Sequence, residues 1–412
     1  MGPFSRSSNS PTRPCPTATS SSPRSARCAR GPSSTSPGTI PTSRTATPAP
    51  CSPPQGSNWR ERCAKSWRRW SSPRRSGRSS RPGSRGTSWA RSSPVADRDG
   101  AVTSLVAGGA GFVGSHLCEK LLARGDRVIA VDNAATGPLG NIEGLLRHPR
   151  FRLVVHDITQ HTWVDDGLDH VLHLASPASP RDYLELPVET MMAGSRGTHN
   201  LLALARAKGA RFLFASSSEV YGDPKENPQC EDYWGNVDPI GVRAVYDEAK
   251  RFSEALVMEY HRTHGLDTRI VRIFNTYGPR MRADDGRVLP NFCCQALLGE
   301  DVTIYGDGMH TRSFCYIDDV VDGVLLLLDS EETRPVNIGN PVEVTMNELA
   351  REVVEIAGSS SRIVHVPLPH HEPRVRRPDI TRAREVLGWE PHIDRRDGIE
   401  RTLESFREPL HI

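Results

Sequence analysis

The chain has 412 residues and a formal net charge of +3, but the charge is unevenly distributed. Residues 1–100 contain 17 Arg and 1 Lys against 3 acidic residues, a balance of about +15, whereas the remaining 312 residues carry about −12. The first hundred residues also lack Leu and contain 15 Pro, so they cannot bury enough apolar surface to offset the entropy lost on folding. We therefore expect a disordered tail over 1–100, which excludes this part from a folded catalytic domain.

Three interpretations of this tail remain open. A basic, Ser-rich start is typical of an organelle transit peptide, and Arg interleaved with Trp is typical of an arm that contacts nucleic acid. Arg, Ser and Pro without helical periodicity are also what a GC-rich gene gives when it is translated upstream of its true start. The last interpretation is favoured, so we expect no nucleic acid as a partner.

No stretch approaches the roughly twenty consecutive apolar residues of a membrane span, and the start has no apolar signal core. We expect a soluble, cytoplasmic protein that does not associate with membranes, with a transit peptide as the weaker alternative. Of the 9 Cys, 4 lie in the tail and the others are Cys118, Cys230, Cys293, Cys294 and Cys315. Because no C-x-x-C pair or Cys/His ligand spacing occurs, we predict reduced thiols and no bound metal.

From residue 101 onward, short β-rich runs alternate with helical patterns. The runs that predict strands are 102–107, 126–132, 151–155, 169–174, 211–215 and 268–273. The patterns that predict helices are 112–124, about 184–208 and 245–264. This alternation is typical of α/β proteins with a doubly wound parallel sheet of the Rossmann type.

A glycine-rich turn follows the first predicted strand. Gly108, Gly111 and Gly114 are spaced G-x-x-G-x-x-G between that strand and the next helix, where glycine lets the backbone approach a pyrophosphate at a helix amino terminus. Asp132 ends the second predicted strand and could accept both hydroxyls of an adenosine ribose. The cofactor site is expected to comprise Gly108, Gly111, Phe112, Val113, Gly114, Asp132, Asn133, Asp157, Ile158, Leu174, Ala175, Tyr246 and Lys250.

The same segment also indicates which dinucleotide is bound. The carboxylate of Asp132 would repel a 2′-phosphate, and the following Asn133-Ala-Ala offers no Arg to pair with one. NAD is therefore favoured over NADP. We expect residues 101–279 to form the NAD-binding domain and 280–412 to form a smaller α/β lobe that binds substrate, with about 335–340 returning to the sheet as a strand.

Two segments supply candidate catalytic groups. Tyr246-Asp-Glu-Ala-Lys250 places a phenol and an ammonium four residues apart, hence on one face of a helix. Such a spacing is common by chance, and a surface Lys stacked on a Tyr is the ordinary alternative. Its position after the strand that ends in Ala215-Ser-Ser-Ser-Glu219 favours catalysis, because these hydroxyls can hold a substrate oxygen near the phenol.

These residues together resemble the extended short-chain dehydrogenase/reductase superfamily. Six blocks between about 103 and 408 resemble, more closely, the UDP-glucuronate decarboxylases (UDP-xylose synthases). The blocks are Ser218-Glu-Val-Tyr-Gly-Asp-Pro224, Tyr233-Trp-Gly-Asn-Val-Asp-Pro-Ile-Gly241, Tyr246-Asp-Glu-Ala-Lys-Arg251, Arg272-Ile-Phe-Asn-Thr-Tyr-Gly-Pro-Arg-Met281, Asp285-Gly-Arg-Val288 and Thr311-Arg-Ser-Phe314.

The resemblance implies a reaction in which the hydride is returned. In that family NAD oxidises C4 of UDP-glucuronate, the resulting ketone lets the C5 carboxylate leave as carbon dioxide, and NADH then reduces the product to UDP-xylose. Tyr246 would be the base of the first step and the acid of the last. Lys250 would lower the pKa of the phenol and hold the cofactor ribose.

The resemblance also implies roles for polar residues around this pair. Ser217 would hydrogen-bond the C4 oxygen. Ser218 and Glu219 would position the C5 carboxylate and protonate the enolate carbon, directly or through water. Arg312 would orient the departing carboxylate. An alternative for Glu219 is a structural cap in the loop. Arg243, Arg282 and Arg287 are candidate partners for the uronate or diphosphate. Asn275, which resembles the active-site Asn of the family, and Arg312 complete the expected substrate-binding residues.

The family further implies a homodimer built on the helices near 188–208 and 245–264, although buried core packing would explain the same apolar stripes. One departure from the family is Met192, where a Lys that reaches the substrate is more usual; substrate preference is therefore open. Rival functions are a UDP-sugar 4-epimerase, against which Glu219 argues, and a non-catalytic NAD-binding regulator, against which the retained Tyr246 and Lys250 argue. A 4,6-dehydratase is disfavoured because Ser218 cannot act as an acid.

Overall fold

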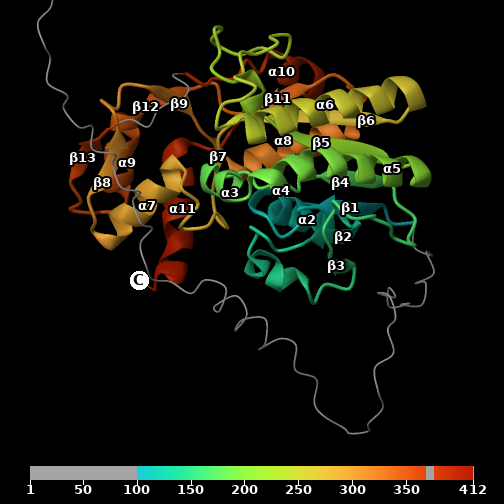
Figure 1. Ribbon diagram of the computed structural model, residues 1–412. Coiled ribbons are helices and arrows are strands. Elements are labelled where there is room, and N and C mark those ends of the chain that lie inside the picture. Colours follow the sequence, from blue (N-terminus) through green and yellow to red (C-terminus); the bar gives the residue numbers. More distant parts are fainter. Residues whose placement is uncertain (1–99, 368–374, 412) are drawn as a thin grey trace, which may run out of the picture. The chain divides into compact units, whose positions relative to one another are not determined.

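The computed structural model describes residues 100–367 and 375–411 (Figure 1). The tail expected over 1–100 lies, except for Gly100, outside these ranges. All described residues belong to one compact unit of the chain. Within the described ranges, no helix combines the length and the apolar character that crossing a membrane requires.

A seven-stranded sheet forms the centre of the described chain, and every strand runs parallel to its neighbours. Its order is β11-β6-β5-β4-β1-β2-β3, which is the doubly wound Rossmann arrangement expected from the sequence. The strands are β1 (Thr103–Ala107), β2 (Arg127–Asp132), β3 (Phe151–Val155), β4 (His170–His173), β5 (Arg211–Ser217), β6 (Thr268–Ile273) and β11 (Val336–Ile338).

Side chains that alternate along each strand enter different layers. Leu105 of β1 and Phe212 of β5 pack with α5 (Thr198–Lys208) and α6 (Ala244–His264) on one face. Val106 of β1 packs on the opposite face, which is covered by α2 (Phe112–Arg124) and α8 (Ile317–Asp329). Because helices cover both faces of the sheet, side chains on both sides of each strand are buried, and the strand sequences are continuous apolar runs.

The structure differs from the sequence prediction over 184–208, where one helix was expected. This stretch contains α3 (Pro180–Glu185), α4 (Pro187–Met192), the π-helical turn η2 (Ala193–Gly197) and α5. Pro187 has no amide hydrogen, and Leu186 before it takes φ −126° and ψ 55°, so the first helix ends and a second one starts there. The π turn brings Gly194 against α6, where a Cβ at this position would lie 2.8 Å from the Cβ of Ala249.

A second group of elements forms a smaller lobe beside the sheet. In Figure 1 its helices α7, α9 and α11 lie together next to β8 and β13. β13 pairs parallel with β8, and β12 pairs antiparallel with β9. The elements are β7 (Thr276–Tyr277), α7 (Val288–Leu298), β8 (Val302–Tyr305), β9 (Thr311–Ser313), β10 (Cys315–Tyr316), β12 (Glu343–Thr345), α9 (Met346–Ile356), β13 (Ile363–Val366) and α11 (Arg395–Leu410).

The chain returns from this lobe to the sheet more than once. β11 pairs with β6 through Val336, Asn337 and Ile338, where the sequence predicted a strand. Helix α8 packs on α2, and α10 (Thr381–Leu387) packs on both β11 and α8. Trp389, just after α10, donates its Nε1–H to the carbonyl oxygen of Asp319 at 2.9 Å. These returns hold the lobe next to the carboxyl ends of the strands.

Candidate active site

The glycine-rich turn adopts a conformation that only glycine allows. Gly108 has φ +83°, and a Cβ there would lie 2.7 Å from the amide nitrogen of Ala175. A Cβ on Gly114 would lie 2.0 Å from the carbonyl oxygen of Gly108. Helix α2 starts at Phe112 after Gly111, and no side chain caps it, so its first amides are available to an anionic ligand. The turn therefore fits the pyrophosphate of a dinucleotide.

A cavity opens between this turn and the ends of β2, β3 and β4. Of the cofactor-site candidates it is lined by Gly108, Gly111, Asp132, Asn133, Asp157, Ile158, Leu174 and Ala175. Gly114 does not line the cavity but allows α2 to pack against the turn. Met192 of α4 also lines it.

Asp132 stands at the polar end of this dinucleotide cavity. Its Oδ2 accepts the Ala110 N–H at 2.9 Å and its Oδ1 accepts the Ala134 N–H at 2.8 Å, while burial raises the pKa of the carboxyl. Each oxygen retains a lone pair for a ribose hydroxyl. Among the described residues that line this cavity there is no Arg or Lys to pair with a 2′-phosphate, which agrees with the preference for NAD.

A second cavity lies between the sheet and the smaller lobe, and Leu174 and Ser176 line both cavities. It brings together the catalytic candidates Ser217, Ser218, Glu219, Tyr246, Lys250 and Arg312. It is also lined by Phe112 and Val113 and by the binding candidates Arg243, Asn275 and Arg287. Arg282 is absent from this lining, because its guanidinium donates to Asp182 Oδ1 at 2.7 Å and to the Thr136 carbonyl at 3.1 Å. The prediction that Arg282 contacts substrate is therefore not supported.

The phenol of Tyr246 is buried on α6. Burial raises its pKa to about 12, and the leading opposing influences are the charge of Arg287 and a hydrogen bond with Ser217. Its ring stacks on that of Tyr183, with centroids 5.3 Å apart and an interplanar angle of 16°. The sequence analysis did not identify Tyr183, whose position in a short helix carries no motif.

Lys250 lies one helical turn further along α6. Its Nζ donates to the Ala215 carbonyl at 2.8 Å and lies 5.5 Å from the Tyr246 ring centroid, and burial lowers its pKa to about 8. The expectation that Lys250, together with the positive charge of the nicotinamide, lowers the pKa of the phenol stays a prediction. The pair is nevertheless placed as expected, at the carboxyl end of β5.

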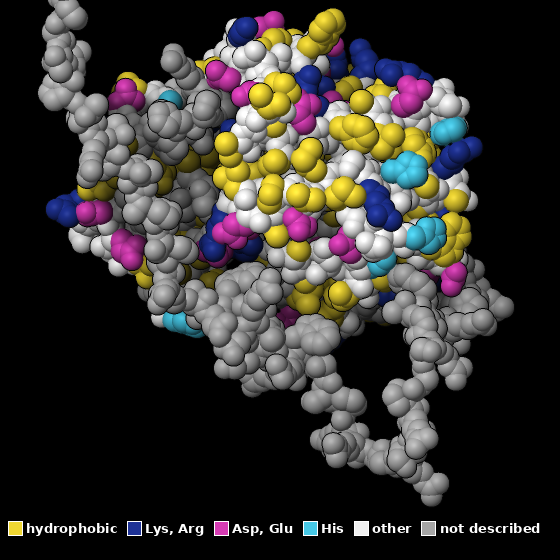
Figure 2. Space-filling view, in the orientation of Figure 1, with side chains coloured by type: hydrophobic (Ala, Val, Ile, Leu, Met, Phe, Trp, Pro, Cys, Tyr) yellow, Lys and Arg dark blue, Asp and Glu magenta, His cyan; other side chains and the backbone are white. Residues whose placement is uncertain are grey.

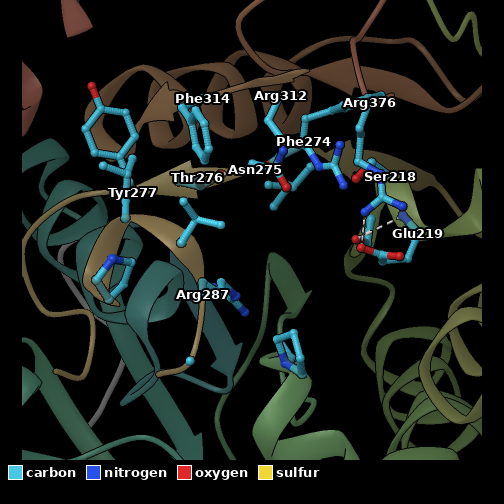
Figure 3. A pocket seen from close by; sticks show the side chains of 18 of the residues that line it. Ser218, Glu219, Phe274, Asn275, Thr276, Tyr277, Arg287, Arg312, Phe314 and Arg376 are labelled. Atoms are coloured by element: carbon cyan, nitrogen blue, oxygen red, sulfur yellow. Dashed lines mark hydrogen bonds and ion pairs between the residues drawn. The ribbon is translucent and has the colours of Figure 1, made fainter. Parts of the chain in front are cut away.

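Glu219 is the centre of a charged cluster. Arg243 donates from Nη2 to Glu219 Oε2 at 2.7 Å, and Nη1 of Arg376 donates to Glu219 Oε1 (Figure 3). Burial of the carboxylate opposes its ionisation, but the charges and hydrogen bonds of the two guanidinium groups outweigh this effect and lower its pKa to about 2. The ionised carboxylate form of Glu219 is therefore favoured, and its expected role in protonating the enolate carbon, directly or through water, stays a prediction. The hydroxyl of Ser217, not Glu219, caps the following 3-10 turn η3 (Ser218–Tyr221) by accepting the Glu219 N–H at 3.3 Å.

Arg376 is the functional candidate that the sequence analysis missed. It is buried, lines the second cavity and also donates to the Gly222 carbonyl at 3.3 Å. No local signal identifies it, because it is one of several Arg in Arg374-Val-Arg-Arg-Pro378 and lies 157 positions from its partner Glu219.

The remaining polar candidates lie on the wall contributed by the smaller lobe. Figure 3 shows Asn275, Arg287 and Arg312 around the same opening as Glu219 and Arg376. Asn275 donates from Nδ2 to the Ser313 carbonyl at 3.1 Å, and the Arg287 Nε lies 3.4 Å from Asp285 Oδ1. Arg312 donates to the Thr311 carbonyl at 2.8 Å. This wall carries more positive than negative charge, as binding of a nucleoside diphosphate requires.

The sequence of this sheet and of its catalytic segments matches a known family. Residues 104–339 match the NAD dependent epimerase/dehydratase family, and the chain belongs to that family. Among curated relatives, the chain is 52% identical over 309 residues to UDP-glucuronic acid decarboxylase 5 of Arabidopsis thaliana, covering 75% of this chain and 90% of that protein. It is 46% identical over 306 residues to UDP-glucuronic acid decarboxylase 1 of Xenopus tropicalis, covering 74% and 72% of the two chains. The resemblance expected from the sequence is confirmed, as is the class of enzyme.

Solved structures share the fold. UDP-glucose 4-epimerase of Thermotoga maritima, determined with UDP-glucose, has a TM-score of 0.70 and 31% identity, covering 75% of this chain and 100% of that one. UDP-glucuronic acid 4-epimerase of Bacillus cereus, determined with NAD, has a TM-score of 0.65 and 29% identity, covering 75% and 99%. The α/β fold is confirmed, and NAD is the cofactor by which the family is described.

Proposed function

We propose that the chain decarboxylates UDP-glucuronate to UDP-xylose through a 4-keto intermediate, with NAD recycled within each turnover. The observation that carries this proposal is the pair Arg243 and Arg376 in the same cavity as Tyr246 and Lys250. Two guanidinium groups with one carboxylate between them leave an excess positive charge, which suits a substrate that carries a carboxylate. The identities of 46% to 52% to proteins named UDP-glucuronic acid decarboxylases support the same reaction.

The chain's own residues would divide the work as follows. Bound NAD supplies the hydride acceptor for the sugar and returns the hydride at the end. Tyr246 exchanges a proton with the C4 hydroxyl, and Ser217, which hydrogen-bonds the phenol, helps to hold the C4 oxygen. Lys250, anchored on the Ala215 carbonyl, would hold the cofactor ribose. The positive charge of the bound nicotinamide would oppose the effect of burial on the phenol.

The charged cluster of Glu219, Arg243 and Arg376 would bind the carboxylate of the substrate. Arg376 and Arg243 would orient the C5 carboxylate before it leaves, a role that the sequence analysis gave to Arg312. Because Glu219 is ionised, it would hold the two arginines in place instead of delivering a proton, and Ser218 beside it would position the water that protonates the C5 carbon. Arg312, Arg287 and Asn275 would contact the nucleotide.

We also propose that the protein is a homodimer. Figure 2 shows hydrophobic side chains gathered on the face over α3, α4 and α6. Leu184, Val188, Met191 and Phe252 on these helices expose between 46% and 66% of their surface, which is unusual for a solvated face. Size-exclusion chromatography with light scattering tests this proposal: the full chain should elute as a dimer, and Phe252→Asp should shift it toward a monomer.

For localisation, we propose the cytoplasm. The described cysteines Cys118, Cys230, Cys293, Cys294 and Cys315 all carry free thiols, as is usual in a reducing compartment. Fractionation of the source cells with an antibody against the chain would check this, and recovery from a membrane or organelle fraction would overturn it.

A direct assay tests the reaction. Purified full-length chain with UDP-glucuronate and catalytic NAD should release carbon dioxide and form UDP-xylose without net accumulation of NADH. Tyr246→Phe should abolish both products while the variant still binds NAD. Formation of UDP-galacturonate without carbon dioxide would establish a 4-epimerase instead, and unchanged UDP-glucuronate would contradict both enzymatic functions.

A further inference from the structure

Asp247 is an ionisable residue close to the charged cluster of Glu219, Arg243 and Arg376, and the proposed reaction gives it no role. Asp247 follows Tyr246 on α6 and is only 5% exposed. Its Oδ1 is buried and has no hydrogen-bond partner among the described residues. A buried carboxylate without partners is costly, since burial favours the neutral acid.

The charges that act on Asp247 come from several elements. They are Glu219 of η3, Arg243 just before α6, Arg376 after β13 and Glu248 of α6. Burial and the two acids raise the pKa of Asp247, the two arginines lower it, and the balance places it at about 7. Asp247 and Glu219 thus share the same pair of guanidinium groups, and Glu219 holds the closer contacts.

Other charged groups on the elements around this part of α6 are engaged elsewhere or exposed. Arg272 of β6 pairs with Glu254 at 2.8 Å, and Asp182 of α3 pairs with Arg282 at 2.7 Å. Arg251, one turn beyond Asp247, donates to the Val220 and Trp234 carbonyls at 2.9 and 2.8 Å. Arg181 of α3 pairs with Asp284 at 2.7 Å, and Arg211 of β5 and Arg269 of β6 both pair with Asp267 at 2.5 Å. Lys208 of α5 lies 4.4 Å from the Trp163 ring centroid. The other charged or titratable side chains on α3, α4, η2 and α5 are exposed: Glu185, Glu189, Arg196, His199 and Arg206.

We propose that Asp247 sets the net charge of the site formed by Glu219, Arg243 and Arg376, and thereby makes the binding of a carboxylate-bearing sugar nucleotide depend on pH. When Asp247 is protonated, the two arginines and the one carboxylate of Glu219 leave a charge of +1. When Asp247 is ionised, the four groups sum to zero and the site loses its attraction for a second carboxylate. This inference rests on the proposed function, because it takes the C5 carboxylate of the substrate to this site.

The test compares two ligands that differ in the carboxylate. The full chain carrying Tyr246→Phe, which prevents turnover, is saturated with NAD and titrated calorimetrically with UDP-glucuronate and with UDP-glucose at pH 6 and pH 8.5. The affinity for UDP-glucuronate should fall about tenfold over this range, as one added unit charge near a bound ion requires. The affinity for UDP-glucose, which has no carboxylate, should change less than about twofold.

Adding Asp247→Asn to the Tyr246→Phe protein isolates the contribution of Asp247 to the pH dependence of binding. Lys250 also lines the cavity and, because burial lowers its pKa to about 8, loses positive charge over the same range, so a part of the dependence is expected to persist. The fall should shrink to at most about threefold in the Asp247→Asn protein. Glu259→Gln is the matched control, because it neutralises an exposed acid further along α6 that pairs with Arg262 at 3.7 Å and is not among the charges that act on Asp247; the tenfold fall should remain.

Two results would overturn the inference. One is an unchanged tenfold fall in the Asp247→Asn protein, and the other is an equal response of UDP-glucose and UDP-glucuronate to pH in the parent protein. The comparison of UDP-glucose with UDP-glucuronate needs no substitution of Asp247, so it tests the inference even if the Asp247→Asn protein fails to fold. The proposed function is checked separately: absence of carbon dioxide from the unsubstituted chain at any pH would contradict the decarboxylase, whereas a missing pH effect in an active enzyme would contradict only the role of Asp247.

Discussion

The glycine-rich turn and the two-arginine site are built in opposite ways. The turn is made by a single stretch from Gly108 to Gly114, and a Cβ on Gly114 would lie 2.0 Å from the carbonyl oxygen of Gly108 within that stretch. The two-arginine site joins Glu219 to Arg243 and to Arg376, the last 157 positions away. The cofactor shared by the whole family is thus expected to bind at a turn that a short sequence segment forms. The residues expected to bind the substrate, Glu219, Arg243 and Arg376, are distant in sequence and are brought together by the tertiary fold.

Disturbing the glycine-rich turn should have the largest effect. Gly114→Ala should reduce NAD affinity by about 100-fold or more, because its Cβ would meet the rigid carbonyl of Gly108 at 2.0 Å. Calorimetric titration with NAD measures the effect. Gly144→Ala is the matched control, since its Cβ would meet nothing within 4 Å, and it should bind NAD normally. Normal NAD binding by Gly114→Ala would show that the turn is not the cofactor site.

A smaller effect is expected from disturbing the assembled site. Arg376→Gln should lower kcat/KM for UDP-glucuronate by about 10- to 100-fold, since it removes one of the two guanidinium charges, while NAD affinity stays unchanged. Steady-state kinetics with detection of carbon dioxide measures this. The neighbouring Arg377→Gln, whose side chain is 41% exposed and lies 3.6 Å from Glu343, should keep nearly full activity. Equal losses in the two variants would show that Arg376 has no special role.

The smallest effect concerns stability. The pKa of Asp247 is raised to about 7 in the folded state, so the folded chain retains a proton that the unfolded chain loses near pH 4. Stability should therefore fall as pH rises from about 4 to 7, and the penalty should be complete above pH 7. Asp247→Asn removes it and should raise Tm by a few degrees at pH 8 and by less at pH 5, measured by scanning calorimetry. A gain that is equal at both pH values, or that the exposed control Glu259→Gln reproduces, would contradict this.

Much of the fold followed from local patterns. The strands were predicted within a few residues because buried parallel strands are short, continuous apolar runs, and the turn with Asp132 identified the dinucleotide cavity. The helix expected over 184–208 was wrong because Pro187 and the π turn at Ala193–Gly197 interrupt its apolar pattern. Their effect depends on packing against α6, which periodicity does not reveal.

The site was predicted where residues are adjacent in sequence and less well where they are not. The Ser217–Glu219 stretch and Tyr246 with Lys250 were placed correctly in one cavity, since a strand end and a helix face fix them. Arg376 was missed, and Arg282 lies outside the lining of this cavity, because the ion partner of an arginine depends on distant segments. The direction of the Tyr246 pKa could not be foreseen either, since it follows from how deeply α6 is buried.

The repeated crossing of the chain between the sheet and the smaller lobe has a consequence for the cleft. The edge strand β11 and the helices α8 and α10 are contributed by segments that flank parts of the lobe. No single cut would release either side as an independent piece, and loss of one side would expose the apolar surface of the other. Thermal unfolding should therefore occur as one transition. Replacing the smaller lobe by that of another protein to change sugar specificity would require several chain connections to be joined correctly at once.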